Sequence, residues 1–423
     1  KRRIEERDLN LCKISEQKGD EFISGFSFLE ENKLLPKSQK SCWVTYTNTQ
    51  VHEILKTGFN SSPMFQGRIK GSGPRYCPSI EDKINRFAER ERHQLFVEPE
   101  GWNTVEIYVN GFSTSLPEQV QLKALKLVPG FENCKMFRPG YAIEYDYFPP
   151  TQLKASLETK LIKNLFFAGQ INGTTGYEEA ACQGLMAGIN AYNATHNAEP
   201  LVLKRSEAYI GVLIDDLINK GTDEPYRMFT SRAEYRTLLR QDNADLRLTK
   251  IGYKLGLASQ KRVDKVIEKE SNIKNILNLF NSTTIEPTEA ETYLLQIGSS
   301  KMVVKQKLAQ LLLRPSVSIL EMLQSIPSLS EIFKNFDRES LEQTEIQTKY
   351  DTYLQKEQEL VNKMSMLENL QIPSNFDYEK LVSLSTEAKQ KFKKIQPQTL
   401  GQASRISGVN PSGVQILMIY MGR

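Results

Sequence analysis

The pattern of hydrophobic and polar positions changes near residue 200. Before it, short apolar or alternating runs, such as 106–109 and 165–168, are separated by Gly and Pro, which predicts short strands joined by tight connections. After it, apolar residues recur at helical spacing with charges between them, as in 350–367, and Pro373 closes that segment. The chain is therefore predicted to begin as an α/β protein and to end as an all-α one.

Residues 165–191 predict a strand, a glycine loop and a helix. The run 165–168 is fully apolar, as expected of a buried parallel strand. The helix begins near Glu178, and small residues leave one of its faces almost bare: Ala180, Gly184, Ala187 and Ala191. A bare face predicts close packing on a sheet or on a planar ligand. The helix start would offer unpaired N–H groups to a cofactor such as a flavin, although an ordinary strand-to-helix turn has the same pattern.

A turn entering a second helix is predicted at 73–83. Pro78 suits the first helical position, which places Cys77 at the N-cap, and the apolar face would be formed by Ile80, Ile84 and Phe87. The helix dipole and the nearby Arg75 would lower the pKa of the Cys77 thiol and favour its thiolate. A buried structural cysteine is equally compatible with this stretch.

Arg232, Arg236 and Arg240 are spaced by four, which predicts one face of a helix that contacts successive phosphates. Tyr226 or Tyr235 could stack on a base. The alternative is an internal lattice of ion pairs with Glu234, Asp242 and Asp245.

A basic cluster near the C-terminus consists of Lys389, Lys391, Lys393 and Lys394. A helix–turn–helix-like pattern follows, with Leu400, Ala403 and Ile406 on the first helix and a second helix that ends near Met421. A charge run of this kind is usually a solvated face, and a nucleic-acid contact is the alternative.

The amino-acid composition limits which kinds of protein and of binding site are possible. The 423 residues are 39% hydrophobic and 25% charged, which is typical of a folded globular protein. A net charge of +4 means that a nucleic-acid surface must be local, and no apolar run is long enough to span a membrane. Five dispersed cysteines without a C-x-x-C pair and three dispersed histidines disfavour a metal site and indicate a reducing, cytosolic setting. The chain begins at Lys1, which a longer parent protein or a trimmed terminus would explain.

Residues 166–181 resemble the second flavin motif of the glucose-inhibited division protein A family, the tRNA uridine 5-carboxymethylaminomethyl modification enzymes. Gln170 stands where the broader two-dinucleotide-binding flavoprotein class has Asp, which is this family's variant. The family's leading G-x-G-x-x-G unit has no counterpart in this sequence. The resemblance continues through 73–87, 138–146, 224–249 and 401–408.

This resemblance implies an α/β region followed by an all-α region, that is, a partial two-dinucleotide-binding flavoprotein domain plus a C-terminal helical domain. Residues 1–65 would be a remnant of an inserted NAD-associated domain, and 66–200 the C-terminal part of the FAD-binding domain. Residues 201–340 would form a helical linking domain, and 341–423 a C-terminal helical domain that binds tRNA and a partner.

The implied function is that of an FAD-dependent enzyme that works with a GTPase partner. It would install a (carboxymethyl)aminomethyl group at C5 of the wobble uridine of tRNA. NADH would be the reductant and methylene-tetrahydrofolate the one-carbon donor. A cytoplasmic homodimer that joins its partner in a heterotetramer, with no membrane association, is also implied. The alternative is a non-catalytic fragment that binds tRNA and the partner.

The resemblance also implies site residues. Cys77 would be catalytic, adding to C6 of the uracil ring. The residues implied for FAD are Gly169, Gln170, Asn172, Gly173, Gly176, Tyr177 and Ala180. Those implied for NAD are Gly73, Pro74, Arg75, Tyr76, Cys77, Pro78, Ser79, Ile80, Glu81, Asp82, Lys83, Ile84, Asn85, Arg86 and Phe87. Those expected to contact tRNA are Arg227, Arg232, Arg236, Arg240, Lys389, Lys391, Lys393 and Lys394.

Overall fold

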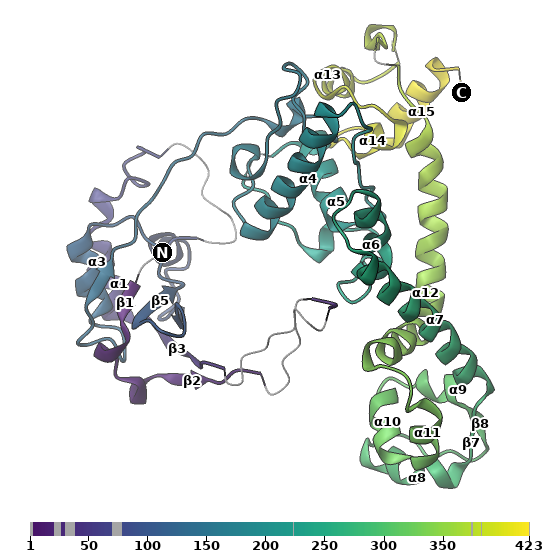
Figure 1. Ribbon diagram of the computed structural model, residues 1–423. Coiled ribbons are helices and arrows are strands. Elements are labelled where there is room, and N and C mark those ends of the chain that lie inside the picture. Colours follow the sequence, from purple (N-terminus) through teal and green to yellow (C-terminus); the bar gives the residue numbers. More distant parts are fainter. Residues whose placement is uncertain are drawn as a thin grey trace. The chain divides into compact units, whose positions relative to one another are not determined.

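The computed structural model describes residues 3–20, 27–29, 39–69, 78–222, 224–373, 375–381 and 383–422 (Figure 1). The chain forms two compact units. The first unit comprises Lys1–Pro149, Gly169–Gly176 and Thr222–Arg227. The second comprises Pro150–Ala168, Tyr177–Gly221 and Met228–Arg423.

The first unit is built on a six-stranded antiparallel sheet with the order β2-β3-β4-β5-β1-β6. Its strands are β1 (Arg3–Glu5), β2 (Ser15–Gln17), β3 (Cys42–Tyr46), β4 (Gln94–Pro99), β5 (Glu106–Asn110) and β6 (Met136–Arg138). Along β5, Ile107 and Val109 are buried and their neighbours are half-buried, as a strand with one face toward a core requires. The strand predicted at 106–109 is thereby confirmed.

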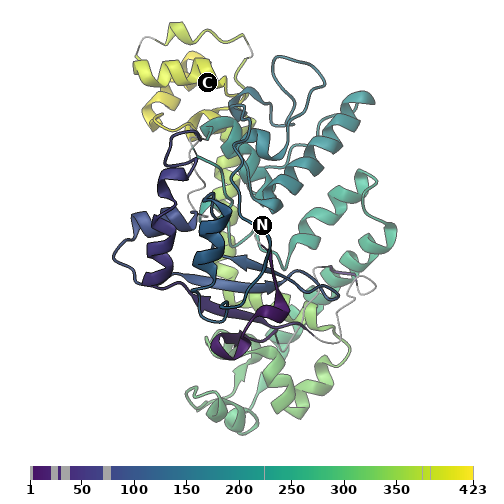
Figure 2. The same cartoon turned by 90° about the vertical axis from the view of Figure 1, so that its left-hand side faces the viewer.

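Three helices pack over this sheet: α1 (Thr49–Lys56), α2 (Ile80–Arg86) and α3 (Glu118–Leu125). Figure 2 shows them lying across one face of the strands. Their apolar residues, such as Val51, Ile84 and Leu125, share one core with Leu95 and Ile107 of the sheet. Because strands from both sides of the predicted boundary at 65/66 join this sheet, that boundary cuts through a single core.

The second unit is helical. Its helices are α4 (Tyr177–Thr195), α5 (Tyr209–Lys220), α6 (Ala244–Lys254), α7 (Gln260–Ser282), α8 (Pro287–Gln296), α9 (Leu308–Leu312), α10 (Ile319–Ser325), α11 (Pro327–Phe333), α12 (Arg338–Asn369), α13 (Thr386–Ile395), α14 (Leu400–Arg405) and α15 (Pro411–Tyr420). A two-stranded ladder joins β7 (Thr284–Ile285) to β8 (Gln306–Lys307). A mixed sheet-and-helix region followed by a helical region confirms the predicted fold class. Among the described residues, no helix combines the length and the apolar character needed to cross a membrane.

The 32-residue helix α12 organises the second unit (Figure 1). Near its start it packs with α7, α9 and α10, and farther along it packs with α14. The first group has its own core around Phe280, Tyr293 and Phe333, and the C-terminal bundle has another around Phe392 and Leu417. The helix ends before Pro373, as predicted, and the predicted boundary at 340/341 falls within its first turn.

Candidate functional site

The glycine loop is a compact structure within the first unit. Residues Gly169–Asn172 form a single 3-10 turn. Gly169 has φ +79° and Gly173 has φ +76°, which is the left-handed region that favours glycine. The loop is closed by the hydroxyl of Thr174, which donates to the Gly169 carbonyl at 2.6 Å. The sequence therefore needs glycine at both positions for backbone reasons alone.

Two segments distant in sequence hold this loop through backbone hydrogen bonds. The Phe148 amide donates to the Ile171 carbonyl at 2.9 Å, and the Tyr226 amide donates to the Gly173 carbonyl at 2.7 Å. Tyr226 is only 4% exposed and Tyr235 only 8%. The prediction that one of these tyrosines stacks on a base is therefore wrong for this conformation, because both rings already lie in protein interiors.

A close approach of the chain to itself adds a second constraint at Gly173. A Cβ there would lie 2.8 Å from Thr222 Oγ1 and 2.8 Å from Tyr147 Cε2. The hydroxyls of Tyr147 and Thr222 are also hydrogen-bonded to each other at 2.7 Å. Neither Tyr147 nor Thr222 was identified from the sequence. The two residues are 75 positions apart, and no local pattern in the sequence indicates that they meet.

One polar group of the loop points to a ligand. The side-chain nitrogen Nε2 of Gln170 is buried and has no hydrogen-bond acceptor among the described residues. Leaving a buried N–H without an acceptor costs about 1–3 kcal/mol, so such a group usually has a function. The nitrogen and carbonyl edges of a flavin ring are acceptors of the required kind. The residues present thus fit the predicted cofactor.

The helix that follows, α4, begins at Tyr177, one residue before the predicted start. Its buried face is mainly polar, and the Glu179 side chain accepts from the Met228 amide at 2.9 Å. The buried residues are Glu179, Gln183, Met186, Ala187, Asn190 and Asn193. The buried face therefore shares only Ala187 with the face that the sequence predicted, among the described residues.

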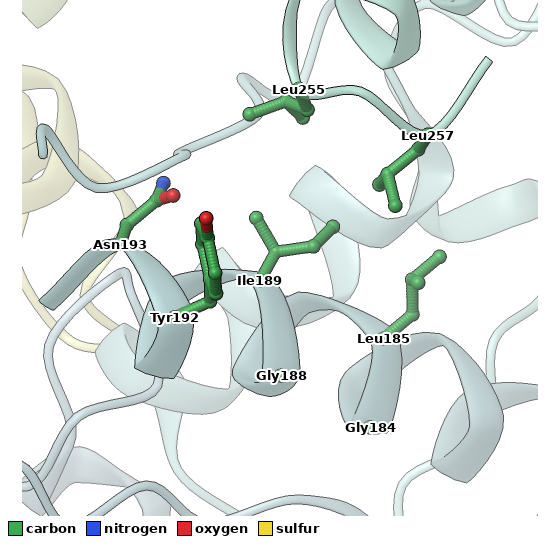
Figure 3. Close-up of a pocket in the computed structure, with 8 residues that line it drawn as sticks. All are labelled: Gly184, Leu185, Gly188, Ile189, Tyr192, Asn193, Leu255 and Leu257. Carbon is green, nitrogen blue, oxygen red and sulfur yellow. The ribbon is translucent and has the colours of Figure 1, made fainter. Parts of the chain in front are cut away.

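The two glycines of α4, Gly184 and Gly188, are exposed. A Cβ added at Gly184 or Gly188 would have no described atom within 4 Å, so the predicted close packing at these glycines is wrong. Both glycines line an open pocket of about 430 Å³. Figure 3 shows Leu255 and Leu257 on its other side, across from Leu185, Ile189 and Tyr192.

The predicted buried parallel strand at 165–168 is also wrong. Phe166 forms a single antiparallel bridge to Glu158, and Leu165 is 36% exposed. The Thr159 amide donates to the Leu165 carbonyl at 2.8 Å, and the Phe167 amide donates to the Leu157 carbonyl at 3.1 Å. A parallel strand needs parallel neighbours on its edges, whereas the bridge formed by Phe166 is antiparallel and reaches the turn that precedes the segment.

The helix after the predicted catalytic cysteine begins later than expected. The N-cap of α2 is Ser79, whose hydroxyl accepts from the Asp82 amide at 3.1 Å. Cys77 is therefore not the N-cap, and Pro78 lies before the helix rather than in its first turn. A serine oxygen accepts the helical N–H groups better than a thiol, which explains the shift. Cys77 itself lies outside the described residues, together with Gly73, Pro74, Arg75 and Tyr76.

The described part of the predicted NAD segment has structural contacts of its own. Ile80 and Ile84 are in the core, as predicted, but Phe87 is 40% exposed and does not belong to the apolar face. Glu81 is fully buried and accepts from both the amide and the hydroxyl of Ser115. The remaining members are half-buried or exposed: Pro78, Ser79, Asp82, Lys83, Asn85 and Arg86.

The arginines predicted to share one helix face do not do so. Only Thr230–Arg232 is helical, as one 3-10 turn, and turns follow. The Arg240 guanidinium pairs with Asp242 at 3.1 Å, as the ion-pair alternative predicted, whereas Arg236 is exposed. Glu234 and Asp245 have other partners, namely Arg205 and Lys269. Arg227 is half-buried in the first unit.

A buried network of charges in the second unit has no local sequence signal. Arg205 pairs with Asp215 at 3.0 Å and with Asp216 at 2.7 Å. Asp215 also receives a two-pronged contact from Arg405, at 2.7 and 2.8 Å, and Arg405 reaches Glu368 as well. These carboxylates raise the pKa of both arginines and outweigh the opposing effect of their burial.

The four C-terminal lysines lie on or beside α13, and three of them are paired. Lys391 pairs with Glu387, and Lys389 and Lys393 both reach Glu379. Lys394 is exposed. The following two helices, α14 and α15, confirm the predicted helix–turn–helix-like pattern, with Leu400, Ala403 and Ile406 buried in its core.

The fold and the loop together define a class of protein in which a sheet unit carries a compact glycine turn and a long helical region follows. Comparison with known proteins identifies the protein family. Residues 1–199 match the family described as "Glucose inhibited division protein A". Residues 260–358 and 360–423 match the C-terminal helical domain and helical bundle of the tRNA modifying enzyme MnmG/GidA.

Individual relatives support the same family assignment. The chain is 60% identical over 421 residues to the tRNA uridine 5-carboxymethylaminomethyl modification enzyme MnmG of Cytophaga hutchinsonii, and 58% identical over 423 residues to that of Christiangramia forsetii. Each alignment covers 100% of this chain and 68% of the relative. The solved structure of Aquifex aeolicus GidA in its form I crystal is 43% identical, with a TM-score of 0.84 over 100% of this chain and 67% of that one.

The chain therefore belongs to the glucose-inhibited division protein A family of tRNA modification enzymes. It spans about two thirds of the length of these relatives.

Proposed function

We propose that the chain acts in an FAD-dependent enzyme that installs a (carboxymethyl)aminomethyl group at C5 of the wobble uridine of tRNA, together with a GTPase partner. The observation that carries this proposal is the Gly169–Gly176 loop, because its buried Gln170 amide lacks an acceptor among the described residues. The relatives' names supply the substrate and the group that is installed.

The residues that would hold FAD are Gly169, Gln170, Asn172, Gly173, Gly176, Tyr177 and Ala180. When bound, FAD would pass electrons between NADH and a one-carbon unit from methylene-tetrahydrofolate. Gln170 would donate from its buried side-chain amide to an acceptor on the flavin ring. NADH would bind at 73–87.

Flavin binding is tested by purifying the chain and recording its visible absorbance after incubation with FAD. We expect a yellow complex, and we expect Gln170→Leu to weaken flavin binding by about tenfold, equivalent to one lost hydrogen bond of about 1.4 kcal/mol. The control is Gln66→Leu, an exposed glutamine of the same unit. A wild-type chain that stays colourless would instead support the alternative, a fragment that binds tRNA and the partner without flavin.

For catalysis, we propose that the Cys77 thiolate adds to C6 of the target uracil, which makes C5 nucleophilic. The test is Cys77→Ser in the complete enzyme, with Cys12→Ser, an exposed cysteine, as the control. Normal tRNA modification by Cys77→Ser would exclude this role.

The first unit would supply a tRNA contact through Arg227. The helical region would supply the others: Arg232, Arg236, Arg240, Lys389, Lys391, Lys393 and Lys394. Arg236 is the exposed member of the four arginines, and Lys393 and Lys394 are the exposed members of the four lysines. Neutralising the four lysines should weaken tRNA binding and flatten its salt dependence, and an unchanged salt slope would count against this surface. We further propose a cytoplasmic homodimer that joins its GTPase partner in a heterotetramer.

A further inference from the structure

The middle of α12 carries an exposed face that the proposed site does not use. Tyr353 is 63% exposed and Leu360 is 51% exposed, and Lys356 and Lys363 are exposed as well. Spacings of three, four and three residues place all four on the same side of the helix. At 1.5 Å per residue the row is about 15 Å long. We call it the α12 face.

The charge on this face is available to a ligand. Within the described residues, neither Lys356 nor Lys363 has an ion pair or a hydrogen bond from its side chain. By contrast, Lys349, one turn before Tyr353, is paired with Glu345 at 2.7 Å and also donates to a backbone carbonyl. Two unpaired ammonium groups on an ordered helix form a local positive surface on a chain whose net charge is only +4.

The acidic residues of α12 do not cancel this charge. Glu357 accepts from the backbone amides of Thr237 and Leu238, and Glu368 is bound to Arg405. Asp351 accepts from the Gln355 side chain on the other flank of the helix. Glu359 borders the face three residues after Lys356 and four before Lys363, and Glu357 borders its other side, four residues after Tyr353.

The α12 face continues into a surface already proposed to contact tRNA. The Glu357 carboxylate fastens the turn at 237–238 to α12, and Arg236 lies directly before that turn and is exposed. Arg236 and Glu357 are both close enough to Tyr209 for their charges to act on the pKa of its hydroxyl, which burial raises. Arg236 therefore lies beside the middle of α12.

We propose that the α12 face binds the backbone of tRNA, with Lys356 and Lys363 on separate phosphates and Tyr353 stacked on a base. The proposal rests on the proposed tRNA substrate. The two lysines are about 10 Å apart along the axis, so they can reach different phosphates. Leu360, between them, offers apolar surface to a ribose or a base. A helical protein partner fits less well, because Glu357 interrupts the apolar seam that such a partner needs.

The test measures binding of a tRNA transcript to the purified chain over a range of salt concentrations. For Lys356→Gln/Lys363→Gln we expect at least tenfold weaker binding and a salt slope reduced by about 1.5, since each phosphate contact contributes about 0.7–0.9. Tyr353→Ala should weaken binding at least about fivefold without changing the slope, and Tyr353→Phe should retain it. Glu359→Gln should strengthen binding by about twofold.

The matched control is Lys274→Gln/Lys305→Gln, which removes the same charge from two exposed lysines that likewise have no side-chain partner among the described residues. Binding by the lysine variant equal to that of this control would overturn the inference while leaving the tRNA substrate intact. A wild-type chain that does not bind tRNA would overturn both for this chain. If Tyr353→Ala/Leu360→Ala changes only the sedimentation of the RNA-free chain, the face covers a protein and the RNA assignment fails.

Discussion

Gly173 shows how one residue can satisfy two demands that the sequence does not distinguish. Its φ of +76° requires glycine for the backbone, and the approach of Tyr147 and Thr222 requires glycine for space. A glycine in a cofactor motif is commonly attributed to the ligand alone. Here the protein's own packing accounts for Gly173, and the ligand argument rests on the buried amide of Gln170 instead.

This distinction predicts the effect of Gly173→Ala on stability. The left-handed backbone should cost about 1–2 kcal/mol, and relieving the contacts with Tyr147 and Thr222 should cost about 1–2 kcal/mol more. The measurement is urea unfolding followed by tryptophan fluorescence, because Trp43 and Trp102 both lie in the first unit and report on it alone.

Gly67→Ala is the matched control for this variant. Gly67 also lies in the first unit and has φ +68°, but a Cβ there would have no described atom within 4 Å. It should therefore lose only the backbone part of the free energy of unfolding. If both variants lose the same free energy of unfolding, the residues next to Gly173 can move to accommodate a Cβ without destabilising the unit.

Among the elements, those set by local sequence were predicted well. The helix α12 and the strand β5 have clear periods, and they formed where expected. The run from Arg232 to Arg240 has helical spacing but forms turns, because distant side chains satisfy its backbone. The Glu357 carboxylate accepts from two of its amides, and the Arg240 side chain donates to the Thr237 carbonyl.

For the candidate site too, the parts formed by adjacent residues were predictable, and the contacts between distant residues were not. The glycine loop and the start of α4 follow from adjacent residues, so the sequence was sufficient to locate them. The segments that hold the loop, at Phe148 and Tyr226, lie 23 and 53 residues from their acceptors, and no periodic pattern connects them. The true cap of α2, Ser79, was missed for a simpler reason: placing Pro78 at the first helical position moved the predicted cap to Cys77.

At the junction of α1 and β4, two buried histidines link the pH to the stability of the first unit. The rings of His52 and His93 are 5.3 Å apart, and Thr47 Oγ1 contacts His52 Nε2 and accepts from the His93 amide, both at 2.8 Å. Burial lowers the pKa of both histidines. Lys56 lowers it further at His52, and His52 itself, Lys83 and Arg90 do so at His93, with small opposite effects from Glu53 and Glu89.

The sign of the effect follows from these lowered pKa values. Above about pH 6.5 both histidines are neutral in the folded and unfolded states, so neither changes the stability. Below it, the unfolded chain takes up protons that the folded unit resists. The free energy of unfolding should then fall by up to about 1.4 kcal/mol per pH unit for each histidine.

Urea unfolding of the first unit between pH 7.5 and 5, monitored by tryptophan fluorescence, measures this dependence over a range of about 2.5 units that brackets the unfolded pKa. His52→Gln and His93→Gln should each flatten the profile. His196→Gln, which removes an exposed imidazole from the second unit, is the control. A wild-type profile that is already flat over this range would contradict the prediction.

On the scale of the whole second unit, a cluster of charges joins the C-terminal bundle to the helices before it. Asp215 of α5, Glu368 near the end of α12 and Arg405 of α14 meet at one point. The side chains of Asp215 and Arg405 are each only 13% exposed. A Cβ at Gly401 would collide with the Glu368 carboxylate, so the small residue in α14 allows this contact. The network also includes Arg205, which shares Asp215.

Removing Arg405 should therefore loosen the bundle rather than unfold it. Arg405→Met keeps much of the volume but leaves Asp215 and Glu368 buried with less positive charge, which should cost about 3 kcal/mol. Amide hydrogen exchange should become faster in α14 and in the last turns of α12 while the α8–α11 region stays protected, because that region has its own core. Lys391→Met, which breaks the more exposed pair with Glu387, should change the stability much less than Arg405→Met does. If exchange in α14 stays as slow in Arg405→Met as in Lys391→Met, apolar packing rather than the charge network holds the bundle in place.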